Sequence, residues 1–89
     1  PALTMRDGAL TATIWRNEQE QGVFYSVTFS RRYKRSDGNY ADANSFSGAE
    51  LLRLSMLAEQ AYRETQALRQ AQAAISTSSV GEAVVGAAQ

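Results

Sequence analysis

The sequence contains no cysteine and no histidine among its 89 residues. Without cysteine, the chain can form no disulfide, no thiolate nucleophile and no sulfur-ligated metal site. Without histidine, it lacks the commonest general base and metal ligand, and it cannot assemble a Ser-His-Asp triad. Acid–base catalysis would have to depend on carboxylates alone, and their spacing pairs none of them convincingly. We therefore expect no catalytic residues and a protein that is not an enzyme.

Other features are also scarce. Proline occurs once, at Pro1, and no apolar run approaches the ~20 residues that cross a membrane. The first residues lack the charged and apolar regions of a secretory signal. We therefore expect a cytoplasmic protein without a membrane partner. Nine basic residues balance nine acidic ones, which argues against coating of nucleic acid by bulk charge but allows a basic face balanced by acids elsewhere.

Loop carboxylates are the remaining candidates for metal binding. They are Glu18, Glu20, Asp37 and Asp42. Their spacing is not that of a calcium loop, and Asp37 is explained by a turn. The glycines are isolated, so no phosphate-binding glycine loop is present. We expect no metal site and no cofactor.

The length is that of one small domain, which we place at residues 1–75. A domain of this size buries a limited share of its surface, so a homodimer is expected to supply further core. Residues 76–89 have mostly small side chains and a single charge, Glu82. We expect them to form a flexible C-terminal tail.

Alternating apolar and polar residues predict strands at residues 9–16, 23–35 and 40–46. Residues 3–6 could add a short strand before the Asp7-Gly8 turn. Residues 17–22 are polar and end in glycine, which predicts a hairpin loop. Asp37-Gly38 predicts a second, tight hairpin turn.

The strand at residues 23–35 changes character along its length. Up to Phe29, its odd-numbered residues are apolar and should face the core, whereas its even-numbered residues should face solvent or a ligand. Beyond Phe29, both faces carry charge. The strand should therefore either project past the core as a hairpin arm or bulge near residues 30–31.

A long helix is expected next. Ser47 is its candidate N-cap, Glu50 is the capping-box partner, and helical periodicity continues to about Ala74. Its apolar stripe could pack on the sheet and also form the seam of a homodimer. We assign this dimer interface to Leu51, Leu54, Leu57, Ala58, Ala61 and Tyr62. The predicted class is α+β, a curved antiparallel sheet of three to four strands followed by one long C-terminal helix.

Four of the nine basic residues fall within residues 31–35. Alternate residues of a strand lie about 6.6 Å apart, at a rise of roughly 3.3 Å per residue. This spacing would allow Arg32 and Lys34 each to meet one phosphate of an extended single strand. The alternatives are a charged edge that discourages aggregation and a localisation signal.

Exposed aromatic rings near this cluster could stack on bases. Trp15 could share a face with Ser26 and Thr28, or it could fill the core at one end of the sheet. Tyr33 and Tyr40 flank the same turn and should be exposed. The full set expected to bind nucleic acid is Trp15, Arg16, Ser26, Thr28, Ser30, Arg31, Arg32, Tyr33, Lys34, Arg35 and Tyr40.

Several short segments carry a resemblance to known proteins. They are Ile14-Trp-Arg-Asn-Glu18, Phe24-Tyr-Ser-Val-Thr28, Ser30-Arg31 with Tyr33-Lys34, Asp37-Gly38, and Ser45-Phe-Ser47 leading to Leu51-Leu52. As a string they resemble small bacterial proteins, with little assigned function, of plasmids, phages and integrative elements. This resemblance covers about residues 8–65.

The order of elements and the residue types also resemble the transcriptional positive-cofactor-four and whirly group. Members of that group have a strongly curved antiparallel sheet and a helix, dimerise through the helices, and bind single-stranded DNA along the sheet. The resemblance implies a single-stranded DNA-binding homodimer in transcription, replication or recombination, with the strand face of residues 26–35 as its site.

From these features we predict a largely sequence-nonspecific protein that binds single-stranded nucleic acid, either DNA or RNA. The alternative is a protein-interaction or regulatory module that docks a partner on its helix or on a sheet edge.

Overall fold

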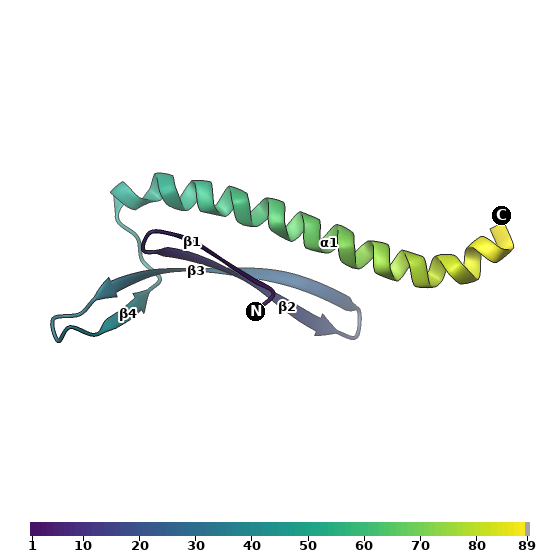
Figure 1. Ribbon diagram of the computed structural model, residues 1–89, viewed down its shortest axis with the longest axis horizontal. Coiled ribbons are helices and arrows are strands. Elements are labelled where there is room, and N and C mark those ends of the chain that lie inside the picture. The colour runs from purple at the N-terminus through teal and green to yellow at the C-terminus, as the bar shows by residue number, and fades with distance from the viewer. Residues whose placement is uncertain (89) are drawn as a thin grey trace.

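The computed structural model describes the backbone of residues 1–88 and the side chains of residues 1–75. Four strands form one antiparallel sheet in the order β1-β2-β3-β4, and a long helix follows them (Figure 1). The elements are β1 (Leu3–Asp7), β2 (Leu10–Gln19), β3 (Gly22–Lys34), β4 (Tyr40–Ala43), the 3-10 helix η1 (Gly48–Glu50) and α1 (Leu51–Ala88). The predicted α+β class and order of elements are confirmed, including the short first strand.

The first hairpin is tighter than the sequence predicts. β2 continues to Gln19 and β3 begins at Gly22, so only residues 20 and 21 form the turn. The prediction of a loop over residues 17–22 is wrong, because both strands remain paired after they leave the core. Side chains there are exposed on both faces of β2, so their polar composition resembles that of a loop. Gly22 has a φ of 138°, which a residue with a side chain rarely adopts.

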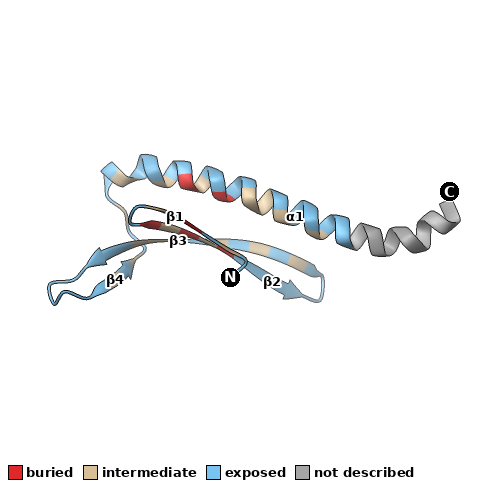
Figure 2. Ribbon diagram, in the orientation of Figure 1, coloured by how far each residue is buried: buried red, intermediate tan, exposed pale blue. Residues whose placement is uncertain are grey.

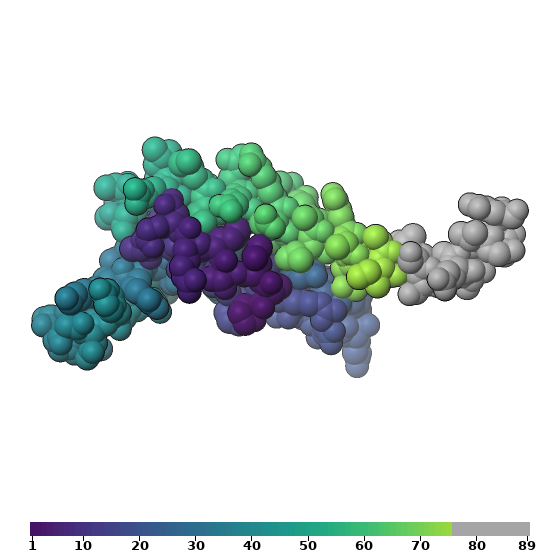
Figure 3. All heavy atoms as spheres, in the orientation of Figure 1, coloured from purple at the N-terminus to yellow at the C-terminus, as the bar shows by residue number. Residues whose placement is uncertain are grey.

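β3 is one uninterrupted strand. It pairs with β2 over residues 22–31 and with β4 over residues 31–34, and neither register skips a residue. The projecting arm is therefore the correct alternative, and a bulge at residues 30–31 is not formed. Gly38, with a φ of 88°, lies in the turn that closes this arm. Figure 3 shows the β3–β4 hairpin as a lobe that extends beyond the body of the molecule.

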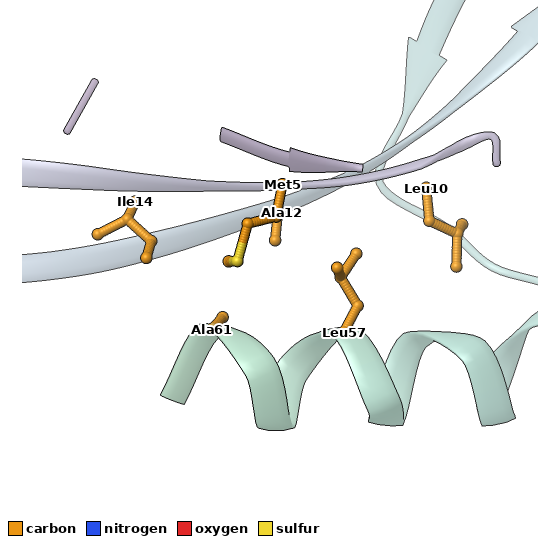
Figure 4. Close-up of a cluster of buried hydrophobic side chains, with 6 residues drawn as sticks. All are labelled: Met5, Leu10, Ala12, Ile14, Leu57 and Ala61. Carbon is orange, nitrogen blue, oxygen red and sulfur yellow. The ribbon is translucent and has the colours of Figure 1, made fainter. Parts of the chain in front are cut away.

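The core lies between α1 and one face of the sheet. It consists of Met5, Leu10, Ala12, Ile14, Leu57 and Ala61. The strand side chains point toward Leu57 and Ala61 of the helix (Figure 4). Because strand side chains alternate, the even residues of β2 and the odd residues of β3 face the helix. Tyr25, Val27 and Phe29 are half-buried at the edge of this core.

The other face of the sheet is covered by no described element (Figure 1). Among the described residues, the buried ones belong to β1, β2 and α1 (Figure 2). β4 ends at Ala43, earlier than the predicted end at Phe46. Phe46 lies in the connection to the helix and packs against the core, as expected of it. The connection between β4 and η1 rises from the sheet to the helix (Figure 1), and strand pairing ends at Ala43, before Phe46.

The helix begins at the predicted capping box. The Ser47 backbone N–H donates a hydrogen bond to Glu50 Oε1 at 2.8 Å. This bond holds the pKa of Glu50 below its ordinary value, and the Arg31 guanidinium lowers it further. Arg31 Nε lies 3.5 Å from Glu50 Oε1 and donates to the Ser45 carbonyl oxygen at 3.0 Å. Arg31 therefore links β3 to the segment that leads into the helix.

α1 is assigned as far as Ala88, beyond the predicted end near Ala74. The flexible tail expected at residues 76–89 falls on residues whose side chains lie outside the described part of the chain. Within the described residues, no helix has the length and apolar character needed to cross a membrane.

Candidate nucleic-acid interface

The uncovered side of the sheet collects hydroxyl, aromatic and basic side chains. We call this surface the open face. It comprises Thr4, Arg6, Thr11, Thr13, Trp15, Asn17, Phe24, Ser26, Thr28, Ser30, Arg32, Lys34, Tyr40 and Asp42. Its three cations outnumber its single carboxylate, so its formal charge is 3 − 1 = +2 although the whole chain is neutral.

One end of the open face is aromatic. The side chains of Trp15 and Phe24 are 40% and 47% exposed. Trp15 Nε1 donates a hydrogen bond to Thr28 Oγ1 at 2.9 Å, and Asn17 Nδ2 donates to Ser26 Oγ at 3.1 Å. Of the two alternatives for Trp15, the exposed position beside the hydroxyl-bearing residues is therefore the correct one. Its polar edge is satisfied and its ring remains accessible.

The other end of the open face is basic. The Arg32 guanidinium carbon lies 6.0 Å from the centroid of the exposed Tyr40 ring, and Arg32 Nε lies 3.8 Å from Asp42 Oδ1. Such a solvent-exposed ion pair stabilises a protein by only about 0–1 kcal/mol, so exchanging the carboxylate for a phosphate costs little. Lys34 lies opposite Tyr40 and forms no ion pair with any residue from 1 to 75.

A hollow of about 220 Å³ lies beside this basic end. Its lining includes Arg6, Thr11, Arg32 and Tyr40. Guanidinium groups match the oxygens of a phosphate with paired hydrogen bonds, so two of them around one hollow make a suitable phosphate site.

Arg6 and Phe24 could bind a ligand on this surface, although neither belongs to the binding set predicted from the sequence. Arg6 lies opposite Thr11, and this position depends on the β1–β2 register. Phe24 is on the even side of β3, and the alternation along β3 already places it with Ser26 and Thr28. That alternation was the available signal for Phe24.

The structure brings together Trp15, Ser26, Thr28, Ser30, Arg32, Lys34 and Tyr40 of the predicted binding set. Arg31 and Tyr33 lie on the helix side of β3, with the Arg31 guanidinium carbon 5.5 Å from the Tyr33 ring centroid. Arg16 is on the helix side of β2 and forms an ion pair with Glu18. The hydrogen bond between the two side chains raises the pKa of Arg16. Arg35 follows the end of β3 in the turn.

The residues of the predicted dimer interface on α1 differ in how far they are buried. Leu57 and Ala61 are buried against the sheet of their own chain. Leu54 and Ala58 are half-buried, whereas Leu51 and Tyr62 are exposed. The buried members pack within one chain and are not available for a contact between helices in this arrangement.

No protein-family model, curated protein or solved structure matches this chain. The likeness to the positive-cofactor-four and whirly group therefore remains a prediction from the sequence.

Proposed function

We propose that the open face binds single-stranded nucleic acid, with DNA as the preferred candidate and little dependence on base sequence. The observation that carries this proposal is the combination, on one uncovered face, of exposed rings, a row of hydroxyl groups and unpaired or weakly paired cations. Rings stack on any base, and cations neutralise phosphates regardless of sequence. We propose transcription, replication or recombination as the setting and a cytoplasmic homodimer as the active form.

The order of groups along β3 supports an extended ligand. Ser26, Thr28 and Ser30 lie between the aromatic end at Phe24 and the basic end at Lys34. The strip from Phe24 to Lys34 is about 33 Å long, at roughly 3.3 Å per residue. A strip of this length is suited to a stretched strand of several nucleotides, comparable with the ~4–16 nucleotides bound by other small single-strand-binding folds.

Trp15 provides a direct assay, because it is the only tryptophan in the chain. Stacking of a base on the indole should quench its fluorescence during titration with unlabelled single-stranded oligonucleotides. Labelled single- and double-stranded oligonucleotides, followed by anisotropy over a salt series, should show tighter binding of the single strand and weaker binding as salt rises.

Trp15→Ala removes one stacking platform worth about 1–3 kcal/mol, so we expect roughly 5- to 150-fold weaker binding by anisotropy. Tyr62→Ala is the matched control, because Tyr62 is also an exposed ring, at 63%, but lies on the helix. It should bind like the wild-type chain. Absence of binding at low salt, binding independent of salt, or equal losses in both variants would refute the proposal.

A second candidate function is the docking of a partner protein on the outer side of α1. Leu52 and Met56 are 72% and 61% exposed there, one helical turn apart. This function would replace the first if oligonucleotides failed to bind and a single stoichiometric protein partner were lost on Leu52→Asp.

A further inference from the structure

β3 has a long unpaired edge. It spans 13 residues, but β4 pairs with it only over residues 31–34. Over residues 22–30, β3 has β2 on one side and no strand of the described residues on the other. Figure 1 shows β4 alongside only one end of β3. We call residues 23–30 of this side the free edge.

The backbone groups that point out of the free edge can be identified. The Arg32 N–H donates to the Ala9 carbonyl oxygen at 2.8 Å, toward β2. Because backbone groups alternate in direction along an antiparallel strand, the other even residues of β3 also point toward β2. The backbone groups of the odd residues point away from β2. Along the free edge these residues are Val23, Tyr25, Val27 and Phe29.

The free edge also lacks the features that keep exposed strands apart. Residues 23–30 contain no charged residue, no proline and no bulge. The opposite edge of the same hairpin differs. β1 covers β2 only as far as Ile14, and the outward-pointing residues beyond it include Arg16 and Glu18. Charges of this kind block edge-to-edge pairing. The β2 edge of the hairpin is therefore protected from pairing with another strand, whereas the free edge of β3 is not.

We infer that a second copy of this chain pairs antiparallel with the free edge about a two-fold axis, joining the two sheets into one. A two-fold contact places odd residues against odd residues, and all four odd residues are apolar. Even residues meet even residues, and over residues 24–30 these are Phe, Ser and Thr. No like charges face each other in such pairs, and the contact closes after two copies.

Burial supports the same partner. Among residues 1–75 the buried core has six side chains, and Tyr25, Val27 and Phe29 at its margin remain half-buried. A second β3 would cover their outward flank. Leu57 and Ala61 of α1 cannot contact a second copy in this way, because they already pack on the sheet of their own chain. The inference concerns the contact between copies and stands apart from nucleic-acid binding.

The first test is the mass in solution together with residue-resolved amide exchange by NMR. Light scattering after size exclusion should give about twice the 9.7 kDa chain mass. The amides of Val23, Tyr25 and Val27 should be protected from hydrogen exchange to the same degree as the even-numbered amides, which point toward β2. The outward amides of Arg16 and Glu18 are the internal control and should exchange freely.

The second test is Val23→Lys, which brings a charge to the free edge. Val23 lies outside the core cluster and opposite Glu18, which offers the new ammonium group a partner within one chain. We expect a monomer in which the amides of residues 23, 25, 27 and 29 lose protection and the even-numbered amides of β3 keep it, showing an intact fold. Gln19→Lys is the matched control, because it adds the same charge at the same hairpin end on β2. It should remain a dimer.

Three results would overturn the inference. The first is a monomeric wild-type chain over the whole concentration range of the NMR samples. The second is a dimer in which the amides of residues 23, 25, 27 and 29 exchange freely, which would place the contact elsewhere. The third is a dimer that persists in Val23→Lys with the amides of residues 25, 27 and 29 still protected.

Discussion

Leu57→Ala tests whether α1 presents the side that the structure assigns to the core. Leu57 is 3% exposed and points into the six-residue core (Figure 4). Truncating a buried leucine costs about 2–5 kcal/mol, from lost apolar burial and from the cavity that remains. A domain of this length has roughly 4–13 kcal/mol of total stability, at about 0.05–0.15 kcal/mol per residue. A loss near 3 kcal/mol should lower Tm by roughly 12–24 °C, at about 4–8 °C per kcal/mol.

Leu52→Ala is the control, because it makes the same substitution on the same helix at a side chain that is 72% exposed. Its free energy of unfolding should change by less than about 0.5 kcal/mol. Urea unfolding followed by circular dichroism and by Trp15 fluorescence, at one protein concentration, measures both variants. Equal losses, or a larger loss in Leu52→Ala, would refute this orientation of α1 and would indicate a contact between helices through Leu52.

Two further predictions concern charge. The folded-state pKa of Glu50 is depressed, so its contribution to stability is complete above the ordinary value of 4.5 and is lost as pH falls through the lower folded value. Thermal unfolding at a series of acid pH values should therefore show a flatter pH dependence in Glu50→Gln than in the wild-type chain; identical curves would contradict the capping argument. On the open face, Arg32→Gln and Lys34→Gln should each reduce the salt slope of oligonucleotide binding by about 0.7. Arg63→Gln, an exposed cation on α1, should leave the slope unchanged, and an equal reduction there would indicate binding by charge alone.

The features that could be predicted depend on local chemistry. The alternation of residues 23–29 predicts which side of β3 meets the helix, because side chains alternate along a strand. Asp37-Gly38 locates the second hairpin, since this tight turn has a positive φ at residue 38, which glycine adopts without strain. Ser47 and Glu50 mark the helix start because the capping box satisfies backbone groups within one turn.

The features that were missed depend on contacts between distant segments. Arg31 belongs to a basic run in the sequence, yet Ser45 and Glu50 hold it on the helix side. No local pattern shows that the chain returns to this point after β4. The place of Arg6 beside Arg32 likewise follows from the registers of three strands. The composition of the sequence indicates which kinds of side chain the candidate site contains. The register between the strands determines which of these side chains share a surface.

The two ends of the open face differ in chemistry. The aromatic end carries the rings of Trp15 and Phe24, and the basic end carries the guanidinium groups of Arg6 and Arg32. A polymer with chemical direction, such as a nucleic-acid strand, meets different partners when it is reversed on this strip. The face therefore has polarity, and under the proposed function a bound strand should take one 5′-to-3′ orientation even without base recognition. Two such faces joined at β3 would run in opposite directions, the relative orientation that complementary strands adopt.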